Sequence, residues 1–138
     1  MRGVSGFDPQ RMARARAKAG LSYRILASRV GVSYATVVGY QQGHTQPRPG
    51  HLVRLAAALD CQVTYLAPLP RAPTLADYRD RAGLTLEEMG RRVGRHSGSV
   101  GRIERGIYWP ADDLDKWAGC YGLQPEEFTR AWRRAARS

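Results

Sequence analysis

The sequence has few of the residues that build cross-linked, metal-bound or membrane-spanning proteins. Only two of its 138 residues are cysteines, Cys61 and Cys120, which lie too far apart for a disulfide framework or a zinc site. We expect both to be small core residues. No stretch approaches the ~20 apolar residues of a membrane helix. The first ten residues also lack the apolar run of a secretory signal. These absences predict a soluble cytoplasmic protein.

Metal, cofactor and catalytic sites are not expected either. The histidines His44, His51 and His96 have no ligand spacing with either cysteine. A cysteine with a distant histidine could suggest a nucleophile, but no orienting group can be argued from the sequence. We therefore expect no metal, no cofactor and no enzymatic activity.

Acidic residues and lysine are scarce as well. The chain has 22 Lys and Arg against 12 Asp and Glu, a formal charge of +10, and only Lys18 and Lys116 are lysines. Residues 1–70 carry nine basic and two acidic side chains, a net of +7. Residues 71–138 carry thirteen and ten, a net of +3. Such a surplus favours a polyanionic partner, and it is concentrated in the first half.

An internal repeat organises the chain. A shift of 63 residues aligns positions 12–47 with 75–110, and eleven of these thirty-six pairs are identical. The identities include Ala19-Gly20-Leu21 with Ala82-Gly83-Leu84, and Arg29-Val30-Gly31 with Arg92-Val93-Gly94. Turn glycines have physical reasons to match, so we interpret the chain as two copies of one unit.

Both units show helical periodicity, with no sustained alternation of period two. Pro68, Pro70 and Pro73 mark residues 68–73 as a semi-rigid linker between a first domain, 1–67, and a second, 74–138. A loop inside one domain is the alternative. Glycines that end helices and Ser or Thr residues that begin them set the boundaries. Helices are predicted at about 9–19, 22–29, 33–42, 49–59 and 63–67, and at about 74–82, 85–93, 97–105, 111–121 and 124–137.

Two short helices joined by a tight, glycine-containing turn form the helix-turn-helix geometry, whose second helix can enter a major groove. Here the sequence resembles the lambda-repressor-like (Cro/cI, XRE-type) helix-turn-helix family, in two tandem copies. The first copy is similar at Gly20-Leu21-Ser22, Leu26-Ala27, Val30-Gly31-Val32-Ser33, Val37, Gly43, Pro47, Leu55-Ala56 and Leu59. The second is similar at Gly83-Leu84-Thr85, Met89, Val93-Gly94, Val100, Ile103-Glu104-Arg105-Gly106, Pro110 and Ala118. The resemblance implies an all-α protein of two bundles with about five short helices each.

The resemblance also implies roles for residues by position. The third helix of each unit would face the bases, through Tyr34, Ala35, Thr36, Val38 and Gly39 in the first copy and Ser97, Gly98, Ser99, Gly101 and Arg102 in the second. Methyl and ring surface in the first set suits thymine methyls, and its hydroxyls suit phosphates or base edges, whereas Arg102 could read guanine. A weak, frayed helix is the alternative for the second. Phosphate contacts would come from Tyr23, Arg24, Ser33, His44, Thr45, Gln46, Arg48 and His96.

Two departures between the copies carry structural expectations. Arg79 and Glu104 stand where the family pairs an arginine with a glutamate, so the resemblance implies an ion pair there. In the first copy the corresponding residues are Arg16 and Gln41, which leaves only a hydrogen bond. Gly90 replaces the alanine that Ala27 supplies in the first copy, and we expect looser packing around it.

Together these features predict a sequence-specific double-stranded DNA-binding regulator of transcription, with repression by promoter occlusion as the hypothesis. In a bacterial cell it would join the nucleoid when bound. The alternative is that only the first unit binds DNA. The second would then be a protein-interaction or dimerisation module, as in antitoxins and phage or plasmid-transfer regulators. Its tryptophans, Trp109, Trp117 and Trp132, would serve either its core or a dimer or partner surface. The amphipathic final helix would close the second core, pair two chains or lie along phosphate.

Overall fold

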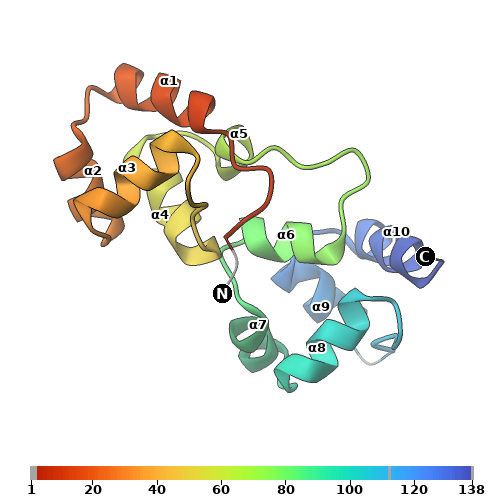
Figure 1. The fold of residues 1–138 in the computed structure, drawn as a ribbon. Helices are drawn as coiled ribbons and strands as arrows, with labels where there is room; N and C mark the ends of the chain where they lie inside the picture. Colours follow the sequence, from red (N-terminus) through yellow and green to blue (C-terminus); the bar gives the residue numbers. More distant parts are fainter. Residues whose placement is uncertain (1–2, 112, 138) are drawn as a thin grey trace. The chain divides into compact units, whose positions relative to one another are not determined.

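The structure, a computed structural model, describes residues 3–111 and 113–137. These residues form ten helices and divide into two compact units, Met1–Leu69 and Pro70–Ser138 (Figure 1). The all-α fold class expected from the sequence is confirmed. Within the described residues no helix has the length and apolar character to cross a membrane.

The first unit consists of five short helices whose ends follow local sequence signals. Ser22 Oγ accepts the Ile25 N–H at 3.2 Å and so caps the second helix, and that helix ends at Gly31, whose φ of 84° favours glycine. The helices are α1 (Pro9–Ala19), α2 (Tyr23–Val30), α3 (Tyr34–Gln42), α4 (Pro49–Ala58) and α5 (Val63–Leu66).

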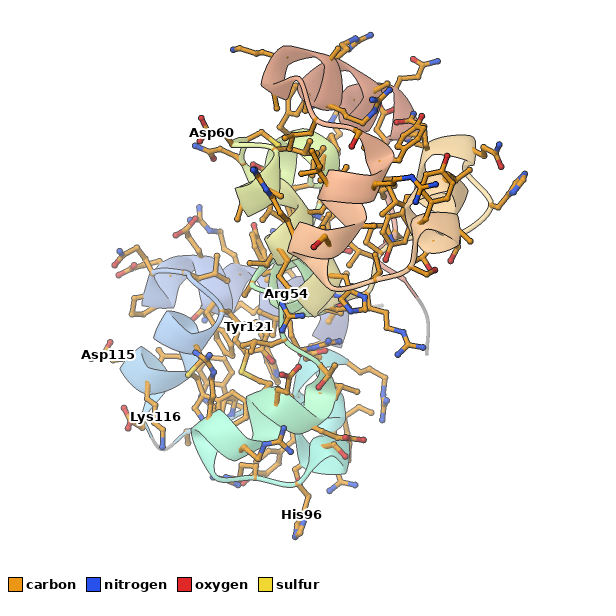
Figure 2. All side chains as sticks on the ribbon, turned by 90° about the vertical axis from the view of Figure 1, so that its left-hand side faces the viewer. Arg54, Asp60, His96, Asp115, Lys116 and Tyr121 are labelled. Atoms are coloured by element: carbon orange, nitrogen blue, oxygen red, sulfur yellow. The ribbon has the colours of Figure 1, made fainter. Side chains whose placement is uncertain are left out.

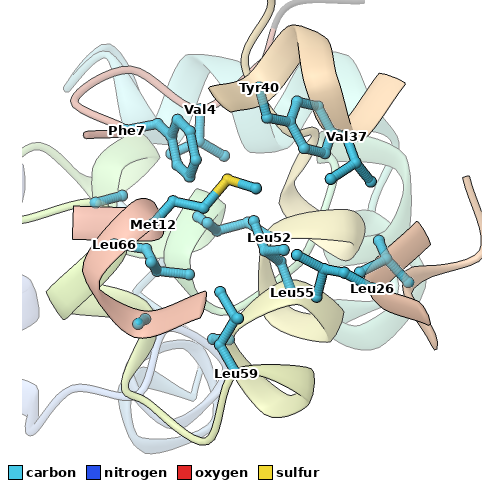
Figure 3. Packing of buried hydrophobic residues seen from close by; sticks show 14 of the residues in the cluster. Val4, Phe7, Met12, Leu26, Val37, Tyr40, Leu52, Leu55, Leu59 and Leu66 are labelled. Carbon is cyan, nitrogen blue, oxygen red and sulfur yellow. The ribbon is translucent and has the colours of Figure 1, made fainter. Parts of the chain in front are cut away.

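One buried core joins these helices (Figure 3). Met12 from α1, Leu26 from α2, Val37 from α3 and Leu52 from α4 are fully buried in it. Each comes from the apolar face that helical spacing places inward. The third helix is therefore held against the core by one face, and its other face is left to solvent.

Residues before α1 also belong to the core. Val4 is fully buried, and its N–H donates to the Pro47 carbonyl at 2.8 Å. The Phe7 ring packs edge-on against Tyr40 with 6.2 Å between centroids. This segment therefore anchors the loop that follows α3. Sequence patterns missed it, because the pairing joins residues more than forty positions apart.

The second unit repeats the plan with α6 (Leu75–Arg81), α7 (Leu86–Val93), α8 (Ser97–Glu104), α9 (Leu114–Cys120) and α10 (Pro125–Ala136). Thr85 and Glu88 form a reciprocal capping box at the start of α7. The backbone N–H of Thr85 lowers the pKa of the Glu88 carboxyl below its usual range. The last helix closes the core, with Phe128 and Ala131 buried.

The ninth helix corrects one predicted boundary. Sequence periodicity predicted a helix over 111–121, but α9 begins at Leu114. Asp113 lies at a φ of 90° and its side chain accepts the Lys116 N–H at 3.2 Å, which caps the helix at that point. Ala111 is not helical, and residue 112 lies outside the described residues. The helix start is therefore set by the Asp113 cap, and not by Pro110, which precedes the predicted start at 111.

Gly90 corrects a second expectation. A methyl group at this position would lie 2.4 Å from the carbonyl oxygen of Arg95, in the turn between α7 and α8. The Arg95 N–H in turn donates to the Gly90 carbonyl at 2.8 Å. The glycine therefore permits a close approach of the backbone. The looser packing that we expected around Gly90 from the sequence is therefore not found.

Replacing Gly90 by alanine is expected to destabilise the second unit by about 1–3 kcal/mol, because the neighbouring backbone must shift. Gly98 is the matched control, since an added Cβ there meets none of the described atoms within 4 Å. Gly98→Ala is expected to stabilise α8 by about 0.5–1 kcal/mol. Urea unfolding followed by tryptophan fluorescence measures both, because all three tryptophans lie in this unit. Equal effects of the two substitutions would contradict the account of Gly90.

Candidate nucleic-acid interface

The first unit joins α2 and α3 by the short turn Gly31–Ser33. Ser33 Oγ accepts the Thr36 N–H at 3.1 Å and so starts α3. Val37 and Tyr40 are buried against the core, which leaves the opposite side of α3 exposed. This arrangement is a helix-turn-helix whose second helix presents one free face.

The predicted base-facing residues occupy different parts of that face. Tyr34 is 51% exposed and Ala35 is also exposed, both in the first turn of α3. Thr36 and Val38 are half-buried, and the Thr36 hydroxyl lies 2.8 Å from Ser33 Oγ. Gly39 faces the following loop, because a Cβ there would lie 3.1 Å from Thr45 Cγ2. The start of the helix is therefore its most accessible part.

Tyr34 and three other side chains form a stacked row. The Tyr23 and Tyr34 rings pack edge to face, with 6.2 Å between their centroids. The Arg16 guanidinium lies 4.2 Å from the Tyr23 centroid, and that of Arg24 lies 5.4 Å from the Tyr34 centroid. Sequence reasoning assigned Tyr23 and Arg24 to phosphate and missed the row, since it depends on how separate helices meet.

The loop between α3 and α4 is polar and accessible. It carries the predicted phosphate-contacting residues His44, Thr45, Gln46 and Arg48, all exposed. The His44 N–H donates to the Gly39 carbonyl at 2.9 Å, which ties the loop to the end of α3. Hydroxyl, amide, imidazole and guanidinium groups are side chains that contact phosphate oxygens. The loop thus extends a polar rim beside the free face of α3.

The second unit places its predicted base-facing residues on α8. Gly98 and Arg102 are exposed, whereas Ser97 and Ser99 are half-buried. Gly101 is buried, so its expected place on the outer face was wrong. His96 is exposed and its ring extends away from the ribbon (Figure 2). Arg102 is the charged side chain that α8 presents to solvent, with Nη2 3.4 Å from Ser99 Oγ.

The loop after α8 differs in chemistry from its counterpart in the first unit. Ile107 is 65% exposed and Tyr108 is 51% exposed, at the positions that correspond to His44 and Thr45. Trp109 packs on Trp132 with ring centroids 4.9 Å apart, and the Trp132 indole N–H donates to the Tyr108 carbonyl at 2.9 Å. The second unit therefore replaces a polar loop by an apolar one.

A buried ionic network ties α6 to α8. Arg79 Nε donates to Glu104 Oε2 at 2.8 Å and Nη2 donates to Oε1 at 3.2 Å, in the bidentate geometry of a strong pair. The Tyr121 hydroxyl donates to the same Oε2 at 2.7 Å. Burial, with Glu104 adding to it, raises the pKa of Tyr121 above its usual value, so the hydroxyl remains a donor. The network ties the last residue of α8 to α6 and to the residue that follows α9.

The first unit lacks this network. The Gln41 amide donates to the Pro9 carbonyl at 2.8 Å, and Arg16 Nη1 donates to the Leu21 carbonyl at 3.0 Å. Among the described residues, Arg16 Nε and Gln41 Oε1 have no hydrogen-bond partner although both atoms are buried. The hydrogen bond that the sequence left possible between these two side chains is therefore not formed among the described residues. Arg16 is turned toward Tyr23 instead.

Comparison with known proteins identifies both units. A helix-turn-helix family model matches residues 12–66, and a second family model, a helix-turn-helix domain, matches residues 72–131. Neither the curated proteins nor the solved structures include a match to the chain. Each family match covers one structural unit, with the turn and the exposed helix inside it.

Proposed function

Since the chain consists of two tandem XRE-like helix-turn-helix domains and is a DNA-binding regulator, we propose that α3 and α8 each enter a major groove. Both helices would read operator sequence on double-stranded DNA. The observation that carries the proposal is the free face of α3, with Tyr34 and Ala35 exposed in its first turn. In helix-turn-helix proteins the first residues of the recognition helix contact base edges.

Charge supports the assignment of the first unit to DNA. It carries nine basic and two acidic residues, but α3 itself contains no charged residue. The basic side chains therefore lie outside α3, and those that flank its free face are suited to phosphate. Arg24 lies on α2, which precedes α3 in the sequence, and Arg48 lies after α3, directly before α4; both are exposed. They fix the protein on the backbone, and α3 supplies the sequence preference.

Covalent linkage explains how so small a module gains affinity. A single unit of this size has a small footprint on DNA, so specific binding normally requires two. In this chain the second unit is tethered to the first, which raises its effective concentration at the neighbouring half-site. One chain would therefore act as a repressor dimer does, occluding a promoter in the nucleoid.

A second candidate function is favoured by the loop after α8. Ile107 is 65% exposed where the first unit has His44, and an isoleucine side chain offers phosphate no hydrogen bond, whereas Tyr108 keeps a hydroxyl where the first unit has Thr45. In this alternative the first unit alone binds DNA. The second unit then serves a homodimer or a partner protein through this loop or α10.

The test of the proposed function is a set of alanine variants on a duplex selected from a random pool. Tyr34→Ala with Thr36→Ala is expected to relax sequence preference at the first half-site, with a loss of about 1–3 kcal/mol per lost base contact. Arg102→Ala is expected to do so at the second half-site. Titration against the selected duplex and its single-base variants measures both. Unchanged preference in the first variant removes α3 from base reading, and an unaffected Arg102→Ala favours the protein-interaction alternative.

A further inference from the structure

We propose that the first unit reads the C5-methyl group of pyrimidines in the major groove, with Tyr34 as the reading side chain and Tyr23 and Arg24 as positioning residues. The proposal rests on the proposed function, because it names the base feature that α3 would contact. Thymine carries this methyl group, and a cytosine methylated at C5 presents the same group at the same place in the groove.

The free face of α3 has few side chains that could hydrogen-bond to base edges. Hydrogen-bond readout uses arginine, lysine, asparagine, glutamine or acidic side chains, and the first half of α3 contains none of these. The Thr36 hydroxyl is already within 2.8 Å of Ser33 Oγ, and the Gln41 amide donates to the Pro9 carbonyl. Gln42 is exposed, but at the last residue of the helix. The exposed start of α3 therefore offers chiefly methyl groups and the Tyr34 ring, whose hydroxyl can make one hydrogen bond at its tip.

The Tyr34 ring is held in place by its neighbours. Tyr34 is 51% exposed, yet Tyr23 packs against it and the Arg24 guanidinium lies 5.4 Å from its centroid. Aromatic pairs and cation–π contacts of this kind each favour one ring position. A side chain ordered before binding loses less entropy when it binds. The row of stacked groups thus presents a rigid apolar edge at the groove-facing end of α3.

This apolar face belongs to a strongly basic unit. The unit bears a net +7, and exposed arginines lie on α1, α2 and before α4. An apolar partner protein would gain little from this charge, whereas DNA is attracted by it. The groove of DNA therefore fits this face, and the methyl group is the apolar feature of that groove.

The second unit supplies an internal contrast. The positions that correspond to Tyr23, Arg24 and Tyr34 hold Leu86, Glu87 and Ser97. Only Arg16 has an arginine as its counterpart, Arg79, and among the described residues that arginine pairs with Glu104. Methyl dependence should therefore be confined to the half-site of the first unit, which gives every measurement a control on the same duplex.

The experiment removes one methyl group at a time from the selected duplex, using the full chain. Deoxyuridine in place of thymidine removes only the C5-methyl group, and one contacted methyl is expected to change Kd by about fourfold. A second arm replaces each T·A pair by C·G or by 5-methylcytosine·G. A tighter complex with methylated than with unmethylated cytosine identifies methylcytosine as a ligand, and a loss with deoxyuridine identifies thymine.

Variants assign the effect to Tyr34 and its neighbours. Tyr34→Ala is expected to bring the thymidine-to-deoxyuridine ratio of Kd close to one. Tyr23→Phe, which retains the ring, should keep the ratio, and Tyr23→Ala or Arg24→Ala should lower it. Tyr108→Ala is the matched control, a tyrosine of equal exposure in the second unit, and it should leave the ratio unchanged.

Two results would overturn the proposal in different ways. Sequence-specific binding that is indifferent to both methyl substitutions rejects methyl readout and leaves the proposed function standing. If the full chain enriches no duplex from the random pool, the proposed function is rejected, and the methyl readout with it.

Discussion

Replacing Glu104 by alanine is expected to destabilise the second unit by about 3–5 kcal/mol. Arg79 is only 9% exposed, and it would lose both of its hydrogen bonds to the carboxylate. Removing one partner of a buried pair leaves the other charge with less compensation, which costs more than the pair itself contributes. Arg79 would keep only Asp80 Oδ1 at 3.2 Å and the Leu84 carbonyl at 3.0 Å, both on Nη1. The Tyr121 hydroxyl would also lose its acceptor in the interior.

Tryptophan fluorescence during urea unfolding measures this loss, because Trp117 lies in the core of the second unit and the first unit contains no tryptophan. Glu87 is the matched control, an exposed glutamate in the first turn of α7. Glu87→Ala is expected to cost at most about 1 kcal/mol. If both substitutions shift the unfolding midpoint equally, the network does not hold α8 to α6.

The second large effect is expected from a negative charge on the reading face. Ala35 on α3 and Gly98 on α8 are exposed and correspond to each other across the repeat. Ala35→Glu is expected to weaken binding to the selected duplex by at least about 100-fold, since like-charge contacts across an interface cost several kcal/mol. Gly98→Glu is expected to act similarly if α8 also enters a groove.

The folded state should tolerate these substitutions, because glutamate is a good helix former and both sites face solvent. Ala57→Glu, at an exposed position near the end of α4, adds the same charge outside the reading face and serves as the control. Affinity is measured for all three at one salt concentration. An Ala35→Glu loss no larger than that of Ala57→Glu would remove α3 from the interface, and an inert Gly98→Glu would support the protein-interaction alternative.

Local signals explain how far the fold could be predicted from the sequence. Ser22, Ser33 and Thr85 begin helices, and Gly31 and Gly94 end them, because caps and left-handed glycines act within a few residues. Long-range contacts gave no such signal. The burial of Val4 depends on a hydrogen bond to Pro47, and the need for Gly90 depends on where the Arg95 carbonyl lies.

The interface shows the same division. The resemblance was enough to place Tyr34 and Ala35 on the exposed first turn of α3, since their position in the motif sets their exposure. It did not indicate that Arg24 stacks on Tyr34 or that Arg16 turns to Tyr23, because those contacts depend on side-chain geometry between helices. Arg16 takes that position where the second unit has the Arg79–Glu104 pair.

Selection of bound duplexes from a random pool at physiological salt, with the full chain, tests most directly whether both units read DNA. The expected result is two enriched motifs at a fixed spacing. We propose one recognition helix in each unit, and a short proline-containing linker joins the units. A single enriched motif would contradict reading by the second unit, and no enrichment at all would contradict the account as a whole.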